Sequence, residues 1–196
     1  YAGTIGDIGC FSFYPTKVMT TGEGGMITTN NKNFYTQMLS YKNFGRGNNP
    51  NFINFLGSNY KISEFTAIIG ILELERIKKR INKRKAIVLR YLKNLKDNDK
   101  YEVITQNRGR SSYYKCIIKT KIKSKIIHNY CNSKGIQLTG KVWDIPIHKQ
   151  QVFKKYAYKS SFKNAEKFSE YHICPPNYPE LTFNEIDYVC SVLNKI

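Results

Sequence analysis

The residues with the clearest capacity for chemistry lie in one short segment around Lys17. A single lysine after a strand is usually a solvated surface group, but Lys17 follows an apolar run that ends at Pro15, which fixes the loop. Hydroxyl groups surround it and could hydrogen-bond an anion: Ser12, Thr16, Thr20 and Thr21. Glycines just beyond them allow the backbone to approach a ligand closely: Gly22, Gly24 and Gly25. The segment is therefore the first candidate for a functional site.

Two short strands must hold this segment in place. Residues 9–13 are apolar and aromatic and end at Tyr14 and Pro15, which is typical of a buried strand that runs into a loop. Residues 26–29 follow the glycine-rich turn and are predicted to form a second strand. We expect the two strands to form a hairpin with a long connecting loop.

The elements that follow are mostly helical. Asn31 could cap a helix over residues 32–42, and the glycine- and asparagine-rich residues 43–59 are predicted to form a loop long enough to suggest a functional role. A long helix is expected over about residues 63–95, with a basic surface over residues 76–85 that we expect to be solvated. Its apolar positions are Phe65, Ile68, Ile69, Leu72 and Ile77.

The C-terminal part of the chain alternates between short elements. Thr182 with Glu185 fits a capping box at the start of the last helix. The expected elements are a strand near residues 113–119 and helices near 124–134, 164–171 and 182–193. The pattern predicts a small α+β unit, which the long helix joins to the first segment.

The charge of the chain is strongly basic. The 196 residues carry a formal net charge of +18, which could mark a nucleic-acid-binding surface. The excess is mostly lysine and accompanies abundant Ile, Asn and Tyr, as an AT-biased coding sequence would produce whatever the function. The aromatic residues fall at strand and helix-core positions and are not interleaved with arginine on one face. A basic nucleic-acid-binding module remains an alternative, but we expect no nucleic-acid partner.

Cysteine and histidine positions indicate neither a metal site nor a disulfide framework. The five cysteines are scattered without a C-x-x-C pair, and the three histidines are not clustered with them. The longest apolar run, residues 67–72, is far too short to cross a bilayer, and no secretory signal pattern opens the chain. We therefore expect a cytoplasmic globular protein without a membrane partner.

The run from Phe11 to Gly25 resembles a family motif. It reads F-S-F-x-x-T-K-x-x-T-T-G-E-G-G, which is similar to the lysine motif of the DegT/DnrJ/EryC1/StrS family of sugar aminotransferases. The similarity continues in the same order along the chain, through residues 56–64, 67–70, 144–148 and 173–182. It therefore spans essentially the whole sequence.

The resemblance implies an α/β fold of the fold-type I class of enzymes that use pyridoxal 5'-phosphate. Residues 1–62 would form the C-terminal part of the cofactor-binding large domain, including part of its sheet. Residues 63–95 would form the interdomain helix, and residues 96–196 the small C-terminal α+β domain. The family's N-terminal half, with its phosphate-binding turn and its aspartate for the ring nitrogen, cannot be placed in this sequence. We therefore expect an incomplete part of an enzyme that is inactive alone.

The resemblance also implies roles for individual residues. Lys17 would form the Schiff base with the cofactor and act as the catalytic lysine, and Ser12 would contact the cofactor phosphate. Asn59 would reach the phosphate of the neighbouring subunit's cofactor in a homodimer. Trp143 and His148 would lie near the sugar nucleotide, although a structural role for His148 is equally open.

The implied reaction is transamination of a nucleotide-linked keto sugar to an amino sugar, with glutamate as the donor. The product would serve the assembly of polysaccharide or glycan. A sugar dehydratase of the same family is an alternative, but that branch replaces the lysine by histidine, whereas this chain has Lys17. Phe44 stands where many relatives carry histidine, which leaves the sugar specificity open.

Overall fold

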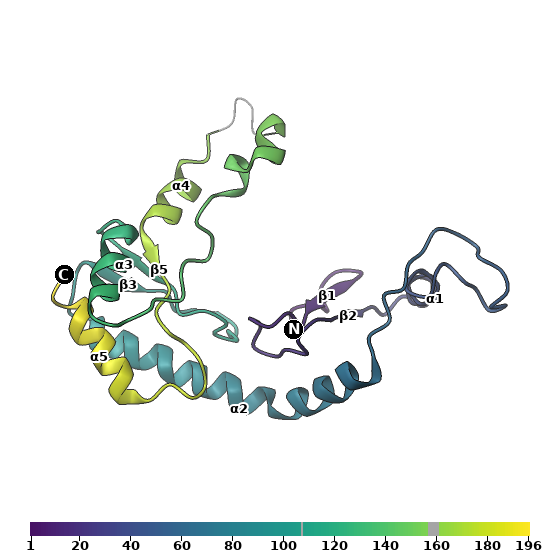
Figure 1. Ribbon diagram of the computed structural model, residues 1–196, viewed down its shortest axis with the longest axis horizontal. Coiled ribbons are helices and arrows are strands. Elements are labelled where there is room, and N and C mark those ends of the chain that lie inside the picture. The colour runs from purple at the N-terminus through teal and green to yellow at the C-terminus, as the bar shows by residue number, and fades with distance from the viewer. Residues whose placement is uncertain (107, 157–160) are drawn as a thin grey trace. The chain divides into compact units, whose positions relative to one another are not determined.

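The computed structural model describes residues 1–106, 108–156 and 161–196, and the chain divides into two compact units. The N-terminal unit comprises Tyr1–Lys78, and the C-terminal unit comprises Lys79–Ile196. The long helix α2, Glu64–Leu95, contributes residues to both units (Figure 1). Among the described residues, no helix is both long enough and apolar enough to cross a lipid bilayer.

The N-terminal unit contains the predicted hairpin. Strands β1, Gly9–Ser12, and β2, Gly25–Thr28, pair in antiparallel fashion, with Gly9 opposite Thr28 and Ser12 opposite Gly25. Helix α1, Lys32–Tyr41, follows, and the Asn31 side chain accepts hydrogen bonds from the backbone N–H groups of Asn33 and Phe34, which confirms the predicted cap. The strand pair is therefore confirmed, but the prediction that the first strand is buried is wrong, because only Gly9 of β1 is buried and no other strand or helix of the described unit covers the pair.

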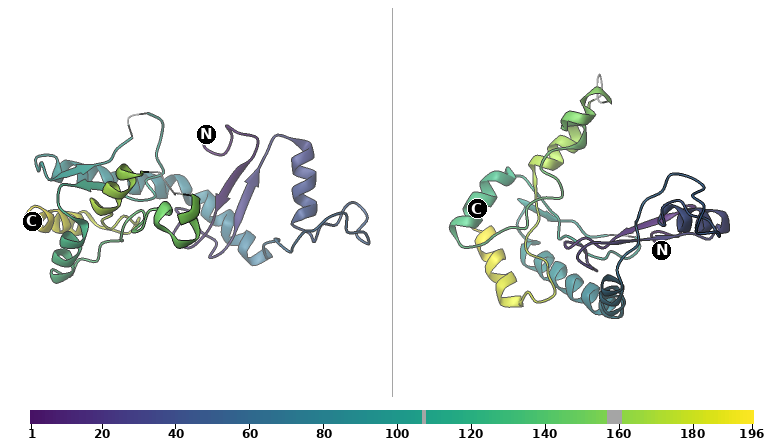
Figure 2. Two further views of the ribbon diagram at one scale, coloured as in Figure 1. Left: turned by 90° about the horizontal axis from the view of Figure 1, so that it is seen from above. Right: turned by 45° about the vertical axis from the view of Figure 1, so that its right-hand side comes forward.

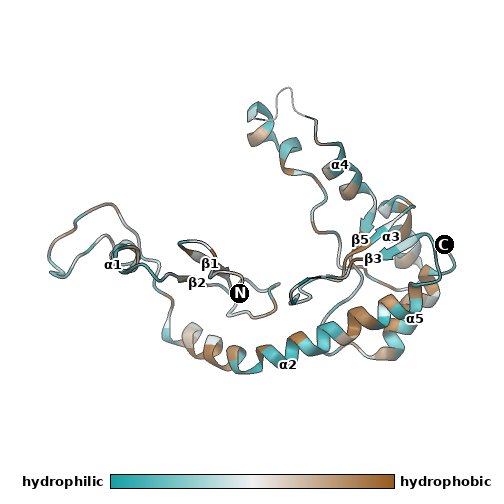
Figure 3. Ribbon diagram, turned by 180° about the vertical axis from the view of Figure 1, so that it is seen from behind, coloured by the Kyte–Doolittle hydropathy of each residue, from teal (hydrophilic) through white to brown (hydrophobic). Residues whose placement is uncertain are grey.

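The apolar positions of the first turns of α2 differ from those of an ordinary buried helix face. The side chains of Phe65, Ile68, Ile69 and Leu72 are all exposed, and brown segments mark this part of α2 in Figure 3. Periodicity predicted that these residues share a stripe, but the N-terminal unit as described does not cover that stripe.

The C-terminal unit contains a three-stranded antiparallel sheet in the order β3-β4-β5. Its strands are β3, Tyr101–Val103, β4, Ile118–Thr120, and β5, His172–Ile173. The helices are α3, Ser124–Ser133, α4, Lys163–Glu170, and α5, Phe183–Leu193, with the 3-10 turns η1, Ile147–Lys149, and η2, Gln151–Tyr156. Helix α5 lies beside the C-terminal part of α2 in two views (Figures 1 and 2), where Asp187 pairs with Arg90.

The hydrophobic core lies in the C-terminal unit and draws on α2, α3, α5 and the sheet. The largest fully buried side chains at its centre include Tyr91, Leu95, Ile118, Ile127, Ile173, Ile186 and Leu193. The predicted capping box of α5 is present, because Thr182 and Glu185 satisfy each other's backbone N–H groups.

The strand predicted near residues 113–119 is wrong in most of its length, since β4 begins only at Ile118. Tyr113 has a positive φ of 49°, which does not suit a strand. The carbonyl oxygens of Tyr113 and Tyr114 accept hydrogen bonds from the side chains of Asn177 and Arg84, not from a strand ladder. Arg84 is consequently half-buried, unlike the solvated basic surface expected around it.

Candidate functional site

The loop that carries Lys17 is closed on one residue, Phe13. The Phe13 carbonyl oxygen accepts hydrogen bonds from the Thr20 hydroxyl at 2.9 Å and the Thr21 N–H at 3.0 Å. The Phe13 N–H donates to the Gly24 carbonyl oxygen at 2.9 Å. Lys17 lies within this closed loop, half-buried, and its own N–H donates to the Tyr14 carbonyl oxygen at 2.9 Å. The backbone on both sides of the lysine is therefore fixed by local hydrogen bonds.

Three hydroxyl groups in or next to this loop, those of Ser12, Thr20 and Thr21, differ in whether they donate a hydrogen bond to the backbone. The Thr20 and Thr21 hydroxyls donate to backbone carbonyl oxygens, of Phe13 at 2.9 Å and Glu23 at 2.7 Å, so their hydrogens are not directed at a ligand. The Ser12 hydroxyl oxygen instead accepts a long contact of 3.4 Å from the Tyr14 N–H, which leaves its hydrogen available for donation. Ser12 is thus the better placed of these three hydroxyls to bind an anion.

Helix α2 supports the loop from within the N-terminal unit. Gly24 has a φ of +148°, and a Cβ there would lie 2.7 Å from the Thr21 hydroxyl oxygen and 3.7 Å from the Thr66 methyl group. A Cβ at Gly70 would lie 3.3 Å from the Thr21 methyl group. The close approach of α2 to the loop thus favours a glycine at position 70, whereas Gly24 is required by the fold of the loop itself.

Asn59 lies in a second closed segment of the N-terminal unit. Asn59 forms an antiparallel bridge with Asn43, and the flanking bonds run from the Phe44 N–H to the Ser58 carbonyl oxygen and from the Tyr60 N–H to the Lys42 carbonyl oxygen. The Asn59 side chain is exposed although its backbone is paired. The segment therefore presents the amide outward from a fixed backbone.

Phe44, the position of the expected departure from the family pattern, has a left-handed backbone with a φ of 58°. Such a conformation is unfavourable for a bulky side chain and is found mostly where the surroundings enforce it. The Arg46 guanidinium and the Lys61 ammonium lie 5.4 and 5.8 Å from its ring centre. An aromatic ring close to two cations thus occupies this position.

Trp143 and His148 line one mostly apolar cavity of about 770 Å³ in the C-terminal unit. His148 Nε2 lies 3.0 Å from Glu166 Oε1, and its ring stacks on Phe162 with the ring centres 4.6 Å apart. The indole of Trp143 is 76% exposed. Trp143 and His148, both predicted to lie near a sugar nucleotide, thus line the same cavity.

Sequence reasoning missed Glu166, which fixes His148. Lys149 and His148 both contact its carboxylate, and their hydrogen bonds, that from Lys149 foremost, lower the pKa of Glu166. Glu166 lies in the first turn of α4, far along the chain from His148, so no local spacing connects the two. Lys149, next to His148, was the one local indication that an acidic partner lies nearby.

Comparison with known proteins gives these residues a context. The model of the DegT/DnrJ/EryC1/StrS aminotransferase family matches residues 1–194. The chain belongs to this family. Its fold is that of the fold-type I class, as predicted, and the solved Escherichia coli GDP-4-keto-6-deoxy-D-mannose-3-dehydratase with bound hydrated PLP superposes with a TM-score of 0.86 at 25% identity, covering 98% of this chain and 56% of that one.

Two curated relatives in this family are similar over the full chain. GDP-perosamine synthase of Escherichia coli O157:H7 is 28% identical over 199 residues, which cover 100% of this chain and 53% of the relative. The dTDP-4-amino-4,6-dideoxy-D-glucose transaminase of Shigella dysenteriae is 28% identical over 196 residues, 97% of this chain and 53% of the relative. The chain thus spans about half the length of the curated relatives it matches.

Proposed function

We propose that this chain is part of a pyridoxal-phosphate-dependent aminotransferase. The enzyme would convert a nucleotide-linked keto sugar to an amino sugar, with glutamate as the amino donor. The observation that carries the proposal is the half-buried Lys17 in its closed loop, within a chain that matches the family throughout. The names of the two relatives support the sugar-nucleotide class. The activity belongs to a polypeptide of the relatives' length, and the 196-residue chain alone is expected to be inactive.

The residues of the Lys17 loop fit the cofactor. Lys17 supplies an amine from a fixed backbone, and Ser12 keeps a hydroxyl hydrogen for a phosphate oxygen. Bound pyridoxal phosphate supplies an electron sink for the substrate carbon. Lys17 would hold the cofactor through Nζ and, once displaced, would move a proton at Nζ as a general base and acid.

We further propose that the enzyme is a cytoplasmic homodimer in which Asn59 contacts the cofactor of the neighbouring subunit. The support is the exposed Asn59 amide on a paired backbone, which can reach a second copy without refolding. In this proposal residues 1–62 form part of the cofactor-binding large domain, residues 63–95 the interdomain helix, and residues 96–196 the small C-terminal domain. The product would enter the assembly of polysaccharide or glycan.

The cavity beside Trp143 and His148 would receive part of the sugar nucleotide. Its volume of about 770 Å³ lies within the range of small-molecule sites, and such sites combine apolar walls with a few polar groups. The His148 ring, held by Glu166 and Phe162, provides one polar group of fixed orientation.

A sugar dehydratase is the second candidate, because the similar solved structure is such an enzyme. A dehydratase of this family carries histidine at the lysine position, so that an amine is not returned to the sugar. This chain has lysine there. Lys17 therefore favours transamination.

Borohydride reduction with peptide mapping tests the proposal. The chain is fused behind the part of GDP-perosamine synthase that precedes its matched region, and pyridoxal phosphate is added before reduction. We expect the cofactor label on the peptide with Lys17, loss of the label in Lys17→Arg, and retention in the matched control Lys42→Arg. Label on another peptide would disprove the assignment, and conversion of a keto-sugar substrate to a product that has lost a hydroxyl group and gained no amino group would favour the dehydratase.

A further inference from the structure

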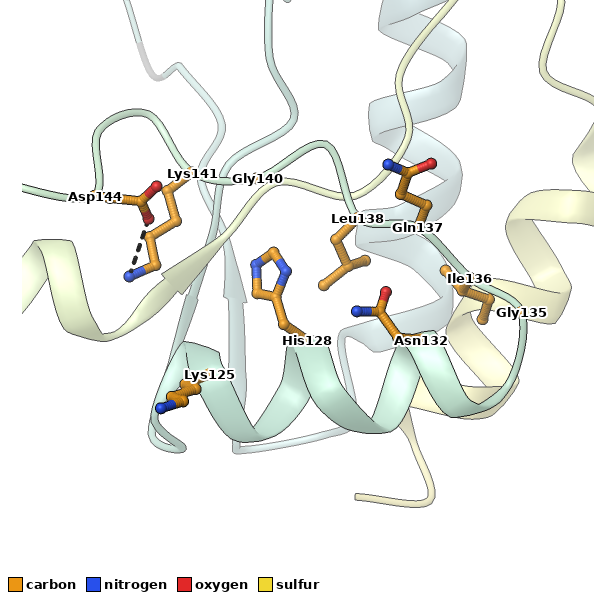
Figure 4. Close-up of a pocket in the computed structure, with 10 residues that line it drawn as sticks. All are labelled: Lys125, His128, Asn132, Gly135, Ile136, Gln137, Leu138, Gly140, Lys141 and Asp144. Carbon is orange, nitrogen blue, oxygen red and sulfur yellow. Dashed lines mark ion pairs between the residues drawn. The ribbon is translucent and has the colours of Figure 1, made fainter.

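A second cavity of about 820 Å³ lies in the C-terminal unit, between α3 and the segment that follows it (Figure 4). One wall is a single helical face, because Lys125, His128 and Asn132 are spaced by one turn or by two. The opposite wall is the segment from Gly135 to Asp144. Among the described residues, none that lines this cavity also lines the His148 cavity.

His128 is the unusual member of this wall. Its Nε2 is buried, and in the part of the chain that the structure describes it has no hydrogen-bond partner. Figure 4 shows the imidazole rising from α3 toward the segment around Gly140. Buried polar atoms are almost always satisfied, so an unpaired one inside a cavity points to a ligand that supplies the partner.

The other polar groups of the cavity favour an anion. Lys125 and Lys141 are cationic, while Asn132 and Gln137 offer amide N–H groups. Among the described residues that line it, Asp144 is the only acidic one, and its carboxylate lies 3.4 Å from Lys141 Nζ. The Asp144 side chain is 76% exposed, whereas that of Lys141 is 17% exposed. Because the carboxylate lies on the solvent side of the pair, an entering anion can replace it as the partner of Lys141.

A metal ion does not fit the same groups. Among the described residues no cluster of three or more His, Cys, Asp and Glu side chains could hold a metal. Burial, and then the charge of Lys141, lower the pKa of His128, so its ring is neutral near pH 7 and offers one N–H. Neutral imidazole, amides and ammonium groups together are donors for an oxyanion.

We propose that this cavity binds an oxyanion of the phosphate class, with His128 Nε2–H as an internal donor and Lys141 as its counter-charge. Lys125 adds a second positive charge from α3. The phosphate belongs either to free inorganic phosphate or to a phosphorylated small molecule, and the two sources share the same recognition. The site requires neither Lys17 nor transamination.

An NMR titration of the 196-residue chain with inorganic phosphate tests the site. We expect saturable shifts of the His128 imidazole signals at constant pH and ionic strength. His128→Gln and Lys141→Gln should each weaken binding about tenfold, as the loss of one charge-assisted hydrogen bond does. Asp144→Asn should strengthen binding several-fold, because it removes the one competing carboxylate.

The matched control is Lys96→Gln, which removes an exposed lysine that does not line the cavity. It should leave the affinity for phosphate unchanged. Equal weakening by Lys96→Gln and Lys141→Gln would show only a response to net charge, and would overturn the proposal. So would the absence of saturation, or an Asp144→Asn variant that binds no better than the original chain.

Uridine and uridine diphosphate distinguish the two sources of phosphate. Tighter binding of uridine diphosphate than of inorganic phosphate, with none of uridine, would support the site and assign it to a phosphorylated small molecule. Binding of inorganic phosphate alone would support it as a site for the free ion. Equal binding of uridine and uridine diphosphate would contradict an oxyanion site.

Discussion

The two units of this chain differ in the interactions that stabilise each of them internally. In the C-terminal unit, apolar side chains of α2, α3, α5 and the sheet meet in one core that includes Ile118, Ile173 and Leu193, each fully buried. In the N-terminal unit, all of whose residues are described, the buried positions are Gly9, Thr21, Gly45 and Glu73. Backbone hydrogen bonds and close approaches at glycine maintain that unit.

The C-terminal unit therefore provides most of the stability, whereas the N-terminal unit carries Lys17, the proposed catalytic residue. A two-stranded piece is marginal in water, and burial of apolar area is the main source of stability in a small domain. The N-terminal unit exposes Met26, Ile27, Leu56, Phe65 and Ile71. The C-terminal unit is therefore expected to fold independently in solution, whereas the Lys17 loop is expected to be labile in the chain alone.

The largest effect should come from the core. Ile118→Ala removes a fully buried side chain at the start of β4 and should lower the free energy of unfolding by about 2–5 kcal/mol. The control Leu74→Ala, at a position 61% exposed on α2, should change it by roughly 0.5 kcal/mol or less. Urea unfolding followed by circular dichroism measures both. Similar losses in the two variants would contradict the assignment of stability to the C-terminal unit.

A smaller and strictly local effect is expected at Gly45. Its φ is +74°, and a Cβ there would lie 1.7 Å from the Phe55 carbonyl oxygen. Gly45→Ala should therefore open the bridge between Asn43 and Asn59, at a local cost of roughly 1–3 kcal/mol. Amide exchange at Phe44 and Tyr60 should accelerate, while exchange in the C-terminal core should not.

Gly22→Ala is the matched control for this variant. Gly22 has a similar φ of +80°, but a Cβ there would meet nothing within 4 Å. The backbone strain is shared and the clash is absent, so its local effect should be smaller. Faster exchange in the C-terminal core of Gly45→Ala would show that the two units are not energetically separate.

The cap of α5 should contribute about 1 kcal/mol to the C-terminal unit. Thr182→Ala removes the hydroxyl that accepts from the Glu185 N–H at 3.3 Å, and exposes the first turn of α5 to fraying. Thr182→Ser keeps the hydroxyl and should retain most of the stability. The midpoint of thermal unfolding measures both, and an equal loss in the serine variant would assign the effect to the lost methyl group.

The smallest effect is a dependence of stability on pH. Burial lowers the pKa of His172, whose Nε2 accepts a hydrogen bond from the Val142 N–H at 2.8 Å. The unfolded chain takes up a proton near the ordinary pKa of about 6.5, whereas the folded chain does so only at lower pH. Stability should therefore fall as the pH drops through about 6.5, and level off below the lowered pKa of the folded state.

His128 contributes in the same direction, because burial lowers its pKa too. His172→Asn should therefore reduce the slope of unfolding free energy against pH between about pH 7.5 and 5 without abolishing it. The carboxylates of Asp99, Glu166 and Asp187, whose pKa values are lowered by their partners, act only at more acidic pH. An unchanged slope in His172→Asn would contradict the prediction.

Sequence patterns predicted the elements with strong local signals. The hairpin, the Asn31 cap, the long helix and the capping box at Thr182 all follow from nearby residues, and the structure confirms each one. Strands β3 and β5 were missed because three and two residues are too short to show a period. The Arg84 contacts with Tyr114 and Asn177 were missed because they join residues far apart in the sequence.

In the candidate site, too, the sequence predicted what depends on neighbouring residues and missed what depends on tertiary contacts. The motif located Lys17 and Ser12 in one short segment, but only the structure distinguishes the Ser12 hydroxyl from those of Thr20 and Thr21. The contact of His148 with Glu166 depends on tertiary packing, which no local pattern carries. The roles of Lys17, Ser12, Asn59, Trp143 and His148 remain predictions.

The closure of the Lys17 loop on Phe13 has a consequence for mutational tolerance. The bonds at Phe13 involve its backbone, so any residue other than proline can form them. Position 20 needs a hydroxyl group, and position 24 needs a glycine because its φ is +148°. These bonds at Phe13 involve neither the Lys17 amine nor the Ser12 hydroxyl. A library of substitutions selected for folding alone should therefore retain Thr20 and Gly24 while it admits most residue types at Phe13.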